Sequence, residues 1–86
     1  VMEAARVSPE VHLLGLTAEE AIHELEKFLD RARMAGLDRV RIIHGKGTGV
    51  LRKAVAEYLA RQPYVVRFSL ASPEEGGTGA TVAELN

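Results

Sequence analysis

The chain carries, at residues 39–49, the run Arg39-Val40-Arg41-Ile42-Ile43-His44-Gly45-Lys46-Gly47-Thr48-Gly49. The β-branched residues in its first half predict a strand, and the three glycines in its second half predict a tight turn. Apolar residues at helical spacing follow from residue 51, so a helix begins directly after the turn. This succession is typical of an anion-binding site, because the first N–H groups of a helix have no partner within it.

The residue types in this turn predict that the anion is a phosphate. Lys46 supplies a positive charge, and the glycines let the backbone come close to a ligand. Among them we expect Gly47 to need a conformation that a Cβ disfavours, and we expect Thr48 to cap the following helix. The turn is not a Walker A motif, in which the lysine follows the last glycine, nor the dinucleotide fingerprint G-x-G-x-x-G.

His44 has two interpretations. An imidazole at the end of the strand could orient water or protonate a leaving oxygen near pH 7. Alternatively, its ring could tie the backbone of the loop. We favour contact with the ligand, because titratable groups in anion sites are often functional. We therefore predict an acid–base role for His44 and a phosphate-positioning role for Lys46.

The charges are distributed unevenly along the chain. The formal net charge is −1, yet residues 31–61 carry eight basic residues against two acidic ones, a net charge of +6. Because this segment brackets the glycine turn, we expect one basic face suited to nucleic acid; the alternative is that these cations only solvate helix surfaces. The predicted phosphate-binding residues are Arg39, Arg41, Gly45, Lys46, Gly47, Thr48, Gly49, Arg52 and Lys53.

Periodicity predicts two helices and about four strands. A short strand at residues 11–14 precedes a helix with a T-x-x-E capping box at Thr17, which Gly36 ends. Residues 40–43 do not strictly alternate, which predicts a strand buried on both faces. The second helix has its apolar stripe at Leu51, Ala54, Val55, Tyr58 and Leu59, and Pro63 ends it.

Two further strands are expected at residues 64–70 and 80–85, joined by a turn at residues 72–79. In the first of them, Val66, Phe68 and Leu70 are expected to share one face. The order β-α-β-α-β-β predicts a two-layer α/β sandwich with a mixed sheet and an antiparallel final pair. Its crossovers bring Leu14-Gly15 and His44-Gly45 to one edge of the sheet, where open α/β sheets bind ligands.

The whole arrangement, with IIHGKGTG between the two helices, resembles the Smr (small MutS-related) domain from about Val11 to the C-terminus. It is most similar to the C-terminal Smr domain of the second bacterial MutS paralogue family. The resemblance implies nucleic-acid binding, often with endonuclease activity, in DNA repair or recombination control or on structured RNA. Members typically carry L-D-L-H/R-G in the first strand, whereas Val11-His12-Leu13-Leu14-Gly15 has His12 in place of the acid and Leu14 in place of the base.

Length and composition exclude several classes of protein. Eighty-six residues allow one domain, here residues 10–86, with residues 1–9 as a linker remnant or N-terminal arm of a larger protein. No run is long enough to span a membrane, so no membrane partner is expected. The absence of cysteine excludes disulfides and thiolate chemistry and fits the cytoplasm.

Metal ligands and aromatic residues are sparse. A divalent ion commonly assists phosphodiester cleavage, but no carboxylate pair adjoins the turn, and nothing in the sequence places Glu74 or Glu75 there. The sequence therefore indicates no preassembled metal site. Phe28 and Phe68 are expected in the core, so few aromatic side chains remain to stack on nucleobases.

Three functions remain open. They are a nicking endonuclease acting on DNA or RNA with little sequence preference, a non-catalytic module that binds branched DNA, RNA or the ribosome, and a protein-interaction tail. The tail would use the acidic face of the first helix, which carries Glu19, Glu20, Glu24, Glu26 and Asp30.

Overall fold

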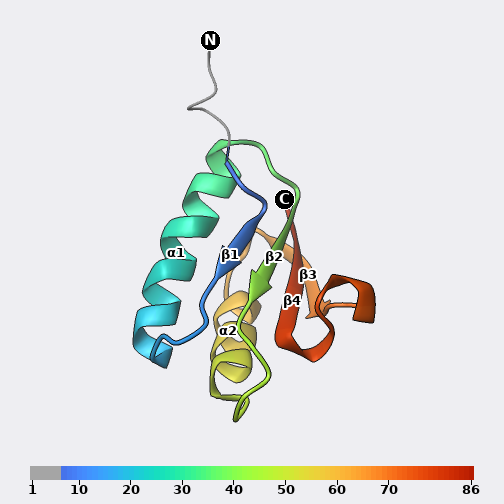
Figure 1. The fold of residues 1–86 in the computed structure, drawn as a ribbon. Coiled ribbons are helices and arrows are strands. Elements are labelled where there is room, and N and C mark those ends of the chain that lie inside the picture. The colour runs from blue at the N-terminus through green and yellow to red at the C-terminus, as the bar shows by residue number, and fades with distance from the viewer. Residues whose placement is uncertain (1–6) are drawn as a thin grey trace.

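Two helices cover one face of a four-stranded sheet in the computed structural model, which describes residues 7–86 (Figure 1). The elements in chain order are β1 (Glu10–His12), α1 (Ala18–Met34), β2 (Arg39–Ile43), α2 (Val50–Ala60), β3 (Val65–Leu70), the short 3-10 helices η2 (Pro73–Glu75) and η3 (Gly77–Gly79), and β4 (Ala80–Leu85). The expected two-layer α/β sandwich with the order β-α-β-α-β-β is confirmed.

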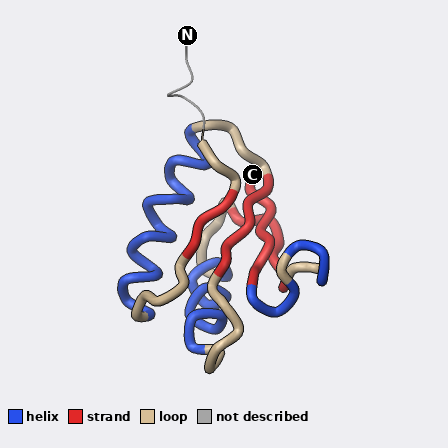
Figure 2. Tube along the Cα trace, in the orientation of Figure 1, coloured by secondary structure: helices blue, strands red, loops and turns tan. Residues whose placement is uncertain are grey.

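The strands lie side by side in the order β1-β2-β4-β3. β1 and β2 are parallel, with Val11 opposite Ile42, and β4 is antiparallel to both β2 and β3. The sheet is therefore mixed, as predicted. Because β1 and β2 run in the same direction, the loops that follow them leave the sheet at the same end, at the bottom of the view in Figure 2.

The start of α1 has the predicted capping box. The Thr17 side chain accepts a hydrogen bond of 3.1 Å from the backbone N–H of Glu20, and the Glu20 carboxylate accepts one of 3.0 Å from the N–H of Thr17. The helix ends at Met34 with Ala35 as its C-cap, and Gly36 follows with a φ of +79°, as expected for a glycine that stops a helix.

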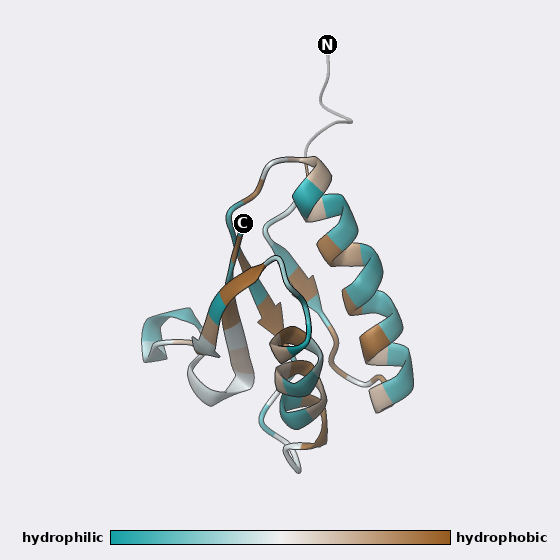
Figure 3. Ribbon diagram, turned by 180° about the vertical axis from the view of Figure 1, so that it is seen from behind, coloured by the Kyte–Doolittle hydropathy of each residue, from teal (hydrophilic) through white to brown (hydrophobic). Residues whose placement is uncertain are grey.

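The core lies between the two helices and the sheet face that they cover. In Figure 3, which views the molecule from behind, the hydrophobic parts of the strands lie behind the helices. Leu25 and Leu29 of α1 pack here, together with Val55 and Leu59 from the predicted stripe of α2. The largest fully buried side chains are Leu13, Leu25, Leu29, Val40, Ile42, Val55 and Leu59.

Two predictions about strand faces are wrong. β2 is not buried on both faces: Val40 and Ile42 face the core, while Arg39 and Arg41 lie on the face that neither α1 nor α2 covers. β3 does not keep its alternation, because the ladder with β4 shifts register between Val65 and Arg67. Such a bulge rotates the residues beyond it relative to those before it, so Val66 is 54% exposed.

The β3–β4 connection at residues 72–79 is a turn, as predicted, and it holds η2 and η3. Its end packs against the loop after β2, because the Gly79 carbonyl accepts hydrogen bonds from the N–H groups of His44 and Gly45, at 3.0 and 2.9 Å. No helix within residues 7–86 is long and apolar enough to cross a membrane. Residues 1–6 of the predicted linker lie outside the described residues.

Candidate phosphate-binding site

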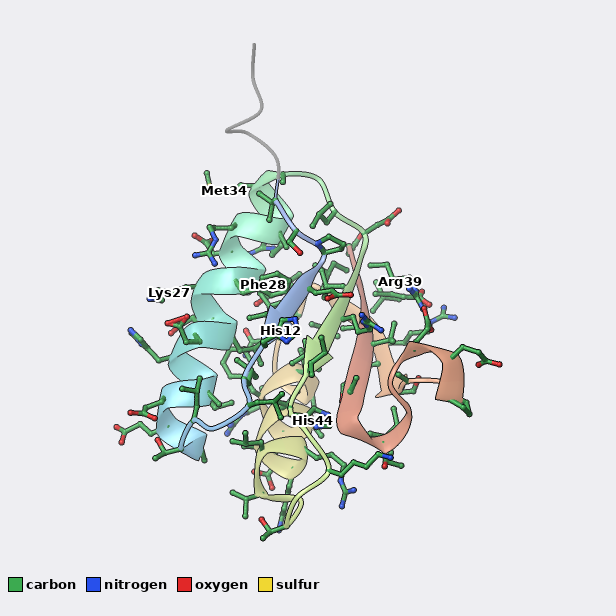
Figure 4. All side chains as sticks on the ribbon, viewed as in Figure 1. His12, Lys27, Phe28, Met34, Arg39 and His44 are labelled. Carbon is green, nitrogen blue, oxygen red and sulfur yellow. The ribbon has the colours of Figure 1, made fainter. Side chains whose placement is uncertain are left out.

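A cavity of about 340 Å³ opens where the loops that follow β1 and β2 meet the start of α2. Residues 14–18 form one of its walls and residues 44–52 the other. As predicted, Leu14-Gly15 and His44-Gly45 lie together at this edge of the sheet. Figure 4 shows His44 at the end of β2 from which the glycine loop begins.

The loop is shaped by its first and last glycines. Gly45 and Gly49 have φ values of +84° and +89°, a region that residues with a Cβ rarely adopt. A Cβ on Gly45 would lie 2.5 Å from Leu14 Cδ2, and one on Gly49 would lie 2.9 Å from Arg52 Nη2. The expectation for Gly47 is wrong, because its φ is not positive and an added Cβ would meet no atom within 4 Å.

The start of α2 leaves backbone donors open to the cavity. Gly49, not Thr48, is the N-cap residue, and no side chain caps this helix. Thr48 makes only a long contact of 3.4 Å from its Oγ1 to the N–H of Val50. Within residues 7–86, no protein acceptor pairs with the N–H groups of residues 46–49 or of Leu51 and Arg52. These donors and the positive end of the helix dipole lie beside the cavity, which suits an anion.

Cationic side chains surround these donors. Lys46 and Arg52 line the cavity, and Lys53 lies one residue further along α2. No ion pair between described residues involves any of the three. The first turn of α2 contains no acidic residue, and none of the residues that line the cavity is Asp or Glu. The cavity is therefore electropositive.

His44 is buried against β4 and is only 4% exposed. Its Nδ1 lies 3.0 Å from the Gly45 carbonyl oxygen, and its Nε2 lies 2.8 Å from Thr81 Oγ1. A carbonyl can only accept, so Nδ1 carries a proton; in the neutral ring, Nε2 then accepts from the Thr81 hydroxyl. Both ring nitrogens are thus engaged within the protein, and the ring ties the loop to β4. These contacts match the second of the two interpretations of His44.

The two arginines of β2 lie away from the cavity, on the uncovered face of the sheet. Figure 4 shows Arg39 near the opposite end of β2 from His44. The Arg39 guanidinium pairs with both carboxylate oxygens of Glu75, at 2.9 and 3.0 Å. Arg41 pairs with Glu10 and donates a hydrogen bond of 2.7 Å to the Glu75 carbonyl. The +6 segment therefore does not form a single basic face.

The contact between Arg39 and Glu75 shifts the pKa values of both side chains. Hydrogen bonding to Arg39 lowers the pKa of the Glu75 carboxyl below its usual value of 4.5, and the same contact raises the pKa of Arg39. Glu75 thus lies against β2 on the uncovered face and does not line the cavity. Within residues 7–86, no group of three or more His, Cys, Asp or Glu side chains could hold a metal ion.

Sequence reasoning missed Thr81 and the role of Leu14. Thr81 is only 3% exposed and is separated from His44 by 37 positions, so no local sequence pattern predicts their hydrogen bond. Leu14 is 58% exposed, but its side chain lies against Gly45. The position of Leu14 at this edge followed from the order of strands and helices, but its contact with Gly45 did not. The side chain of His12, which replaces the acid of the family motif, is 65% exposed.

The family model described as the Smr domain matches residues 11–86. Among relatives, Endonuclease MutS2 of Thermomicrobium roseum is 54% identical over 80 residues, which are 93% of this chain and 10% of the relative. Endonuclease MutS2 of Symbiobacterium thermophilum is 55% identical over 85 residues, which are 99% of this chain and 11% of the relative. The chain thus spans about a tenth of the length of these relatives.

Two solved structures share the fold. The crystal structure of the Smr domain of Thermus thermophilus MutS2 has a TM-score of 0.87 and 49% identity, and the match covers 90% of this chain and 96% of that one. YdaL, a stand-alone small MutS-related protein from Escherichia coli, has a TM-score of 0.87 and 32% identity, over 91% of this chain and 64% of that one.

Proposed function

The chain belongs to the Smr domain family, and we propose that it binds nucleic acid through backbone phosphates and nicks one strand with little sequence preference. The proposal is supported by relatives that carry the name endonuclease. The observation that carries it is the cavity at the start of α2, where unpaired backbone donors lie beside Lys46 and Arg52. Such donors contact phosphate without reading bases, so we expect little sequence preference.

Lys46 is the group that we assign to the reacting phosphate. Hydrolysis breaks one P–O bond, with water supplying a hydroxyl to phosphorus and a proton to the leaving oxygen. Negative charge grows on the phosphate oxygens in the transition state, and an ammonium group with preorganised N–H donors stabilises it there. Lys46 and the amides of residues 46–49 supply both, and Arg52 holds the neighbouring phosphate oxygens.

His44 acts, in this proposal, by holding the loop. Its ring contacts the Gly45 carbonyl and Thr81, so it fixes the peptide from which Lys46 projects. The acid–base role expected from the sequence would require the ring to release one of these partners. A pair of variants separates the two roles: Thr81→Val removes the hydroxyl contact and keeps the imidazole, whereas His44→Ala removes both.

A non-catalytic module that binds DNA, RNA or the ribosome is the second candidate. It is favoured by the engaged ring of His44 and by the lack of carboxylates among the residues that line the cavity. The residues that are present do not form a ready site for a divalent ion, so no step of the proposed reaction is assigned to a metal. In both cases we propose a role as one module of a larger cytoplasmic protein, since the chain matches about a tenth of its relatives.

Binding is tested by fluorescence anisotropy with a labelled DNA duplex, a branched DNA and a structured RNA over a range of salt concentrations. Affinity should fall steeply as salt rises, because neutralised phosphates release counterions. The double variant Lys46→Ala/Arg52→Ala should bind all ligands more weakly and lower the salt slope by about 2. An unchanged slope would show that these cations do not contact phosphate. Arg39→Ala/Arg41→Ala is the matched control and should retain the wild-type slope.

Nicking is tested with supercoiled plasmid and structured RNA, each with and without Mg²⁺ or Mn²⁺. Wild-type protein should convert supercoiled plasmid to the open circle, and Lys46→Ala should not. Loss of activity in both Thr81→Val and His44→Ala would support the role of the ring in holding the loop, whereas retained activity in Thr81→Val would show that nicking does not need the Thr81 contact. If purified wild-type protein cleaves no more than Lys46→Ala under any of these conditions while binding persists, the non-catalytic candidate is correct.

A further inference from the structure

A second cavity lies between α2 and β3, and it is apolar. It has a volume of about 390 Å³ and is lined by Arg52, Lys53 and Ala56 of α2, by Phe68, Ser69 and Leu70 of β3, and by Thr81. This volume is within the range of roughly 300–1,000 Å³ typical of small-ligand pockets. Phe68 packs against the core, as predicted, but is only partly buried, and Leu70 is 44% exposed.

The two cavities adjoin each other. Arg52 lines both of them. His44 lines the first and Thr81 the second, and these two residues are joined by a hydrogen bond of 2.8 Å. A ligand held by Arg52 at the glycine loop therefore lies next to the apolar cavity.

The surroundings of the second cavity restrict its occupant. Lys53 and Arg52 contribute positive charge, and neither forms an ion pair with another described residue. Phe68 contributes an aromatic ring and Leu70 an aliphatic wall. A flat apolar group attached to an anionic backbone fits this combination, and an unpaired base of a nucleic-acid strand has both properties.

We propose that the apolar cavity accepts an unpaired nucleobase of the strand whose phosphate is held at the glycine loop. This inference rests on the proposed phosphate-binding function. Because every base has a stacking face, occupancy of the cavity adds affinity without demanding a sequence. It favours strands with unpaired bases over continuous duplex, since a base within a duplex must first leave its stack.

The test compares two single strands of ten residues with the same phosphates. One is an ordinary oligodeoxynucleotide, and the other has an abasic sugar at every position. Wild-type protein should bind the strand with bases at least about fivefold more tightly, the lower end of what one base–aromatic contact contributes. Leu70→Ser should remove most of this preference and leave affinity for the abasic strand unchanged.

Val66→Ser is the matched control, because Val66 lies on the same strand, is 54% exposed, and does not line the cavity. It should retain the wild-type preference. Phe68→Leu keeps an apolar side chain but removes the ring, so this variant should lose the preference for the strand with bases. Its melting temperature is measured to show that it is folded. In ¹⁵N–¹H spectra, the oligonucleotide with bases should shift the amides of residues 68–70, and the abasic strand should shift mainly those of residues 46–52.

Each contrary result has a distinct meaning. Equal wild-type affinity for the two strands would overturn the base site and leave phosphate binding intact, whereas no binding to either would overturn both proposals. Preference that persists in Leu70→Ser would place the base elsewhere and overturn the inference. Two other occupants would also overturn the inference. An acidic peptide is indicated if deca-glutamate, but not the oligonucleotide, shifts the amides of residues 68–70. A second copy of the chain is indicated if the wild type sediments as a dimer and Leu70→Ser as a monomer.

Discussion

The two helices begin in opposite ways, although a threonine lies shortly before each of them. Thr17 caps α1 through a reciprocal pair of hydrogen bonds with Glu20, so the protein itself satisfies that terminus. α2 begins after a left-handed Gly49, without a side-chain cap or an acidic residue in its first turn. A terminus that is satisfied internally stabilises the fold, whereas one that is left open keeps its donors for a ligand.

The sharpest way to abolish this difference is Thr48→Asp. Thr48 Oγ1 lies 3.4 Å from the N–H of Val50, so a carboxylate here would give the amides of α2 an internal acceptor and repel phosphate. Affinity for a DNA duplex should fall at least about tenfold, because like charges in a binding site are costly. Thermal stability should be unchanged or raised. Anisotropy and thermal unfolding measure the two effects.

Ser8→Asp is the matched control. Ser8 is exposed, precedes β1 and does not line the cavity, so this variant adds the same charge away from the start of α2. Its affinity for the duplex should stay close to that of the wild type. Equal losses of affinity in the two variants would show that the effect is one of net charge and does not depend on the open terminus of α2.

The sequence predicted the fold because its local signals agree with one another. The capping box at Thr17, the stop at Gly36 and the helical stripes each determine an element without help from the rest of the chain. Adjacency of the loops after β1 and β2 followed from connectivity alone. The error at Val66 concerns what only pairing decides, because its exposure depends on the register of β3 against β4.

The site could be predicted in part, for the same reason. Residues 44–52 are contiguous in sequence, so the glycine loop and its lysine could be recognised directly. Charge counting, however, cannot tell a paired cation from an unpaired one. Arg39 lies 36 positions from its partner Glu75, and only the folded β3–β4 connection brings them together. His44 meets Thr81 in the same way, across 37 positions.

The glycines of the loop provide the next test of the α2 terminus. Gly45→Ala and Gly49→Ala should each destabilise the protein by about 1–2 kcal/mol, the usual cost of a left-handed residue with a Cβ. Gly47→Ala is the matched control and should stay within about 0.5 kcal/mol of the wild type. Urea unfolding measures the three values. A loss at Gly47 as large as at Gly45 would contradict the loop conformation described above.

The threonines before the two helices predict a smaller difference, which concerns the free energy of unfolding. Thr17→Ala removes a side-chain acceptor from the start of α1 and should cost about 1 kcal/mol of unfolding free energy. Thr48→Ala removes only the long contact to Val50 and should cost less than about 0.5 kcal/mol. Both variants can be measured in the same urea series. A larger loss for Thr48→Ala would mean that its hydroxyl, and not Gly49, determines the start of α2.

The smallest effect concerns the paired cations of β2, which contrast with the unpaired ones at α2. Hydrogen bonding to Arg39 lowers the pKa of the Glu75 carboxyl in the folded state below its ordinary value of 4.5. The pair therefore contributes stability that is fully present above this ordinary value. It is lost as the pH falls through the lower folded pKa, because the folded protein must then bind a proton that the unfolded chain already holds.

Glu75→Gln should accordingly reduce stability slightly at pH 7 and weaken the dependence of stability on pH below about pH 4.5. Glu74→Gln is the matched control, because its carboxylate is exposed and pairs with no cation within residues 7–86. Urea unfolding of both variants and the wild type at pH 7, 4 and 3 gives the comparison. If Glu74→Gln flattened the pH profile as much as Glu75→Gln does, the Arg39 pair would not be the source of this dependence. Arg39 would then be as unpaired in solution as Arg52 is in the structure, and the contrast between paired and unpaired cations would be lost.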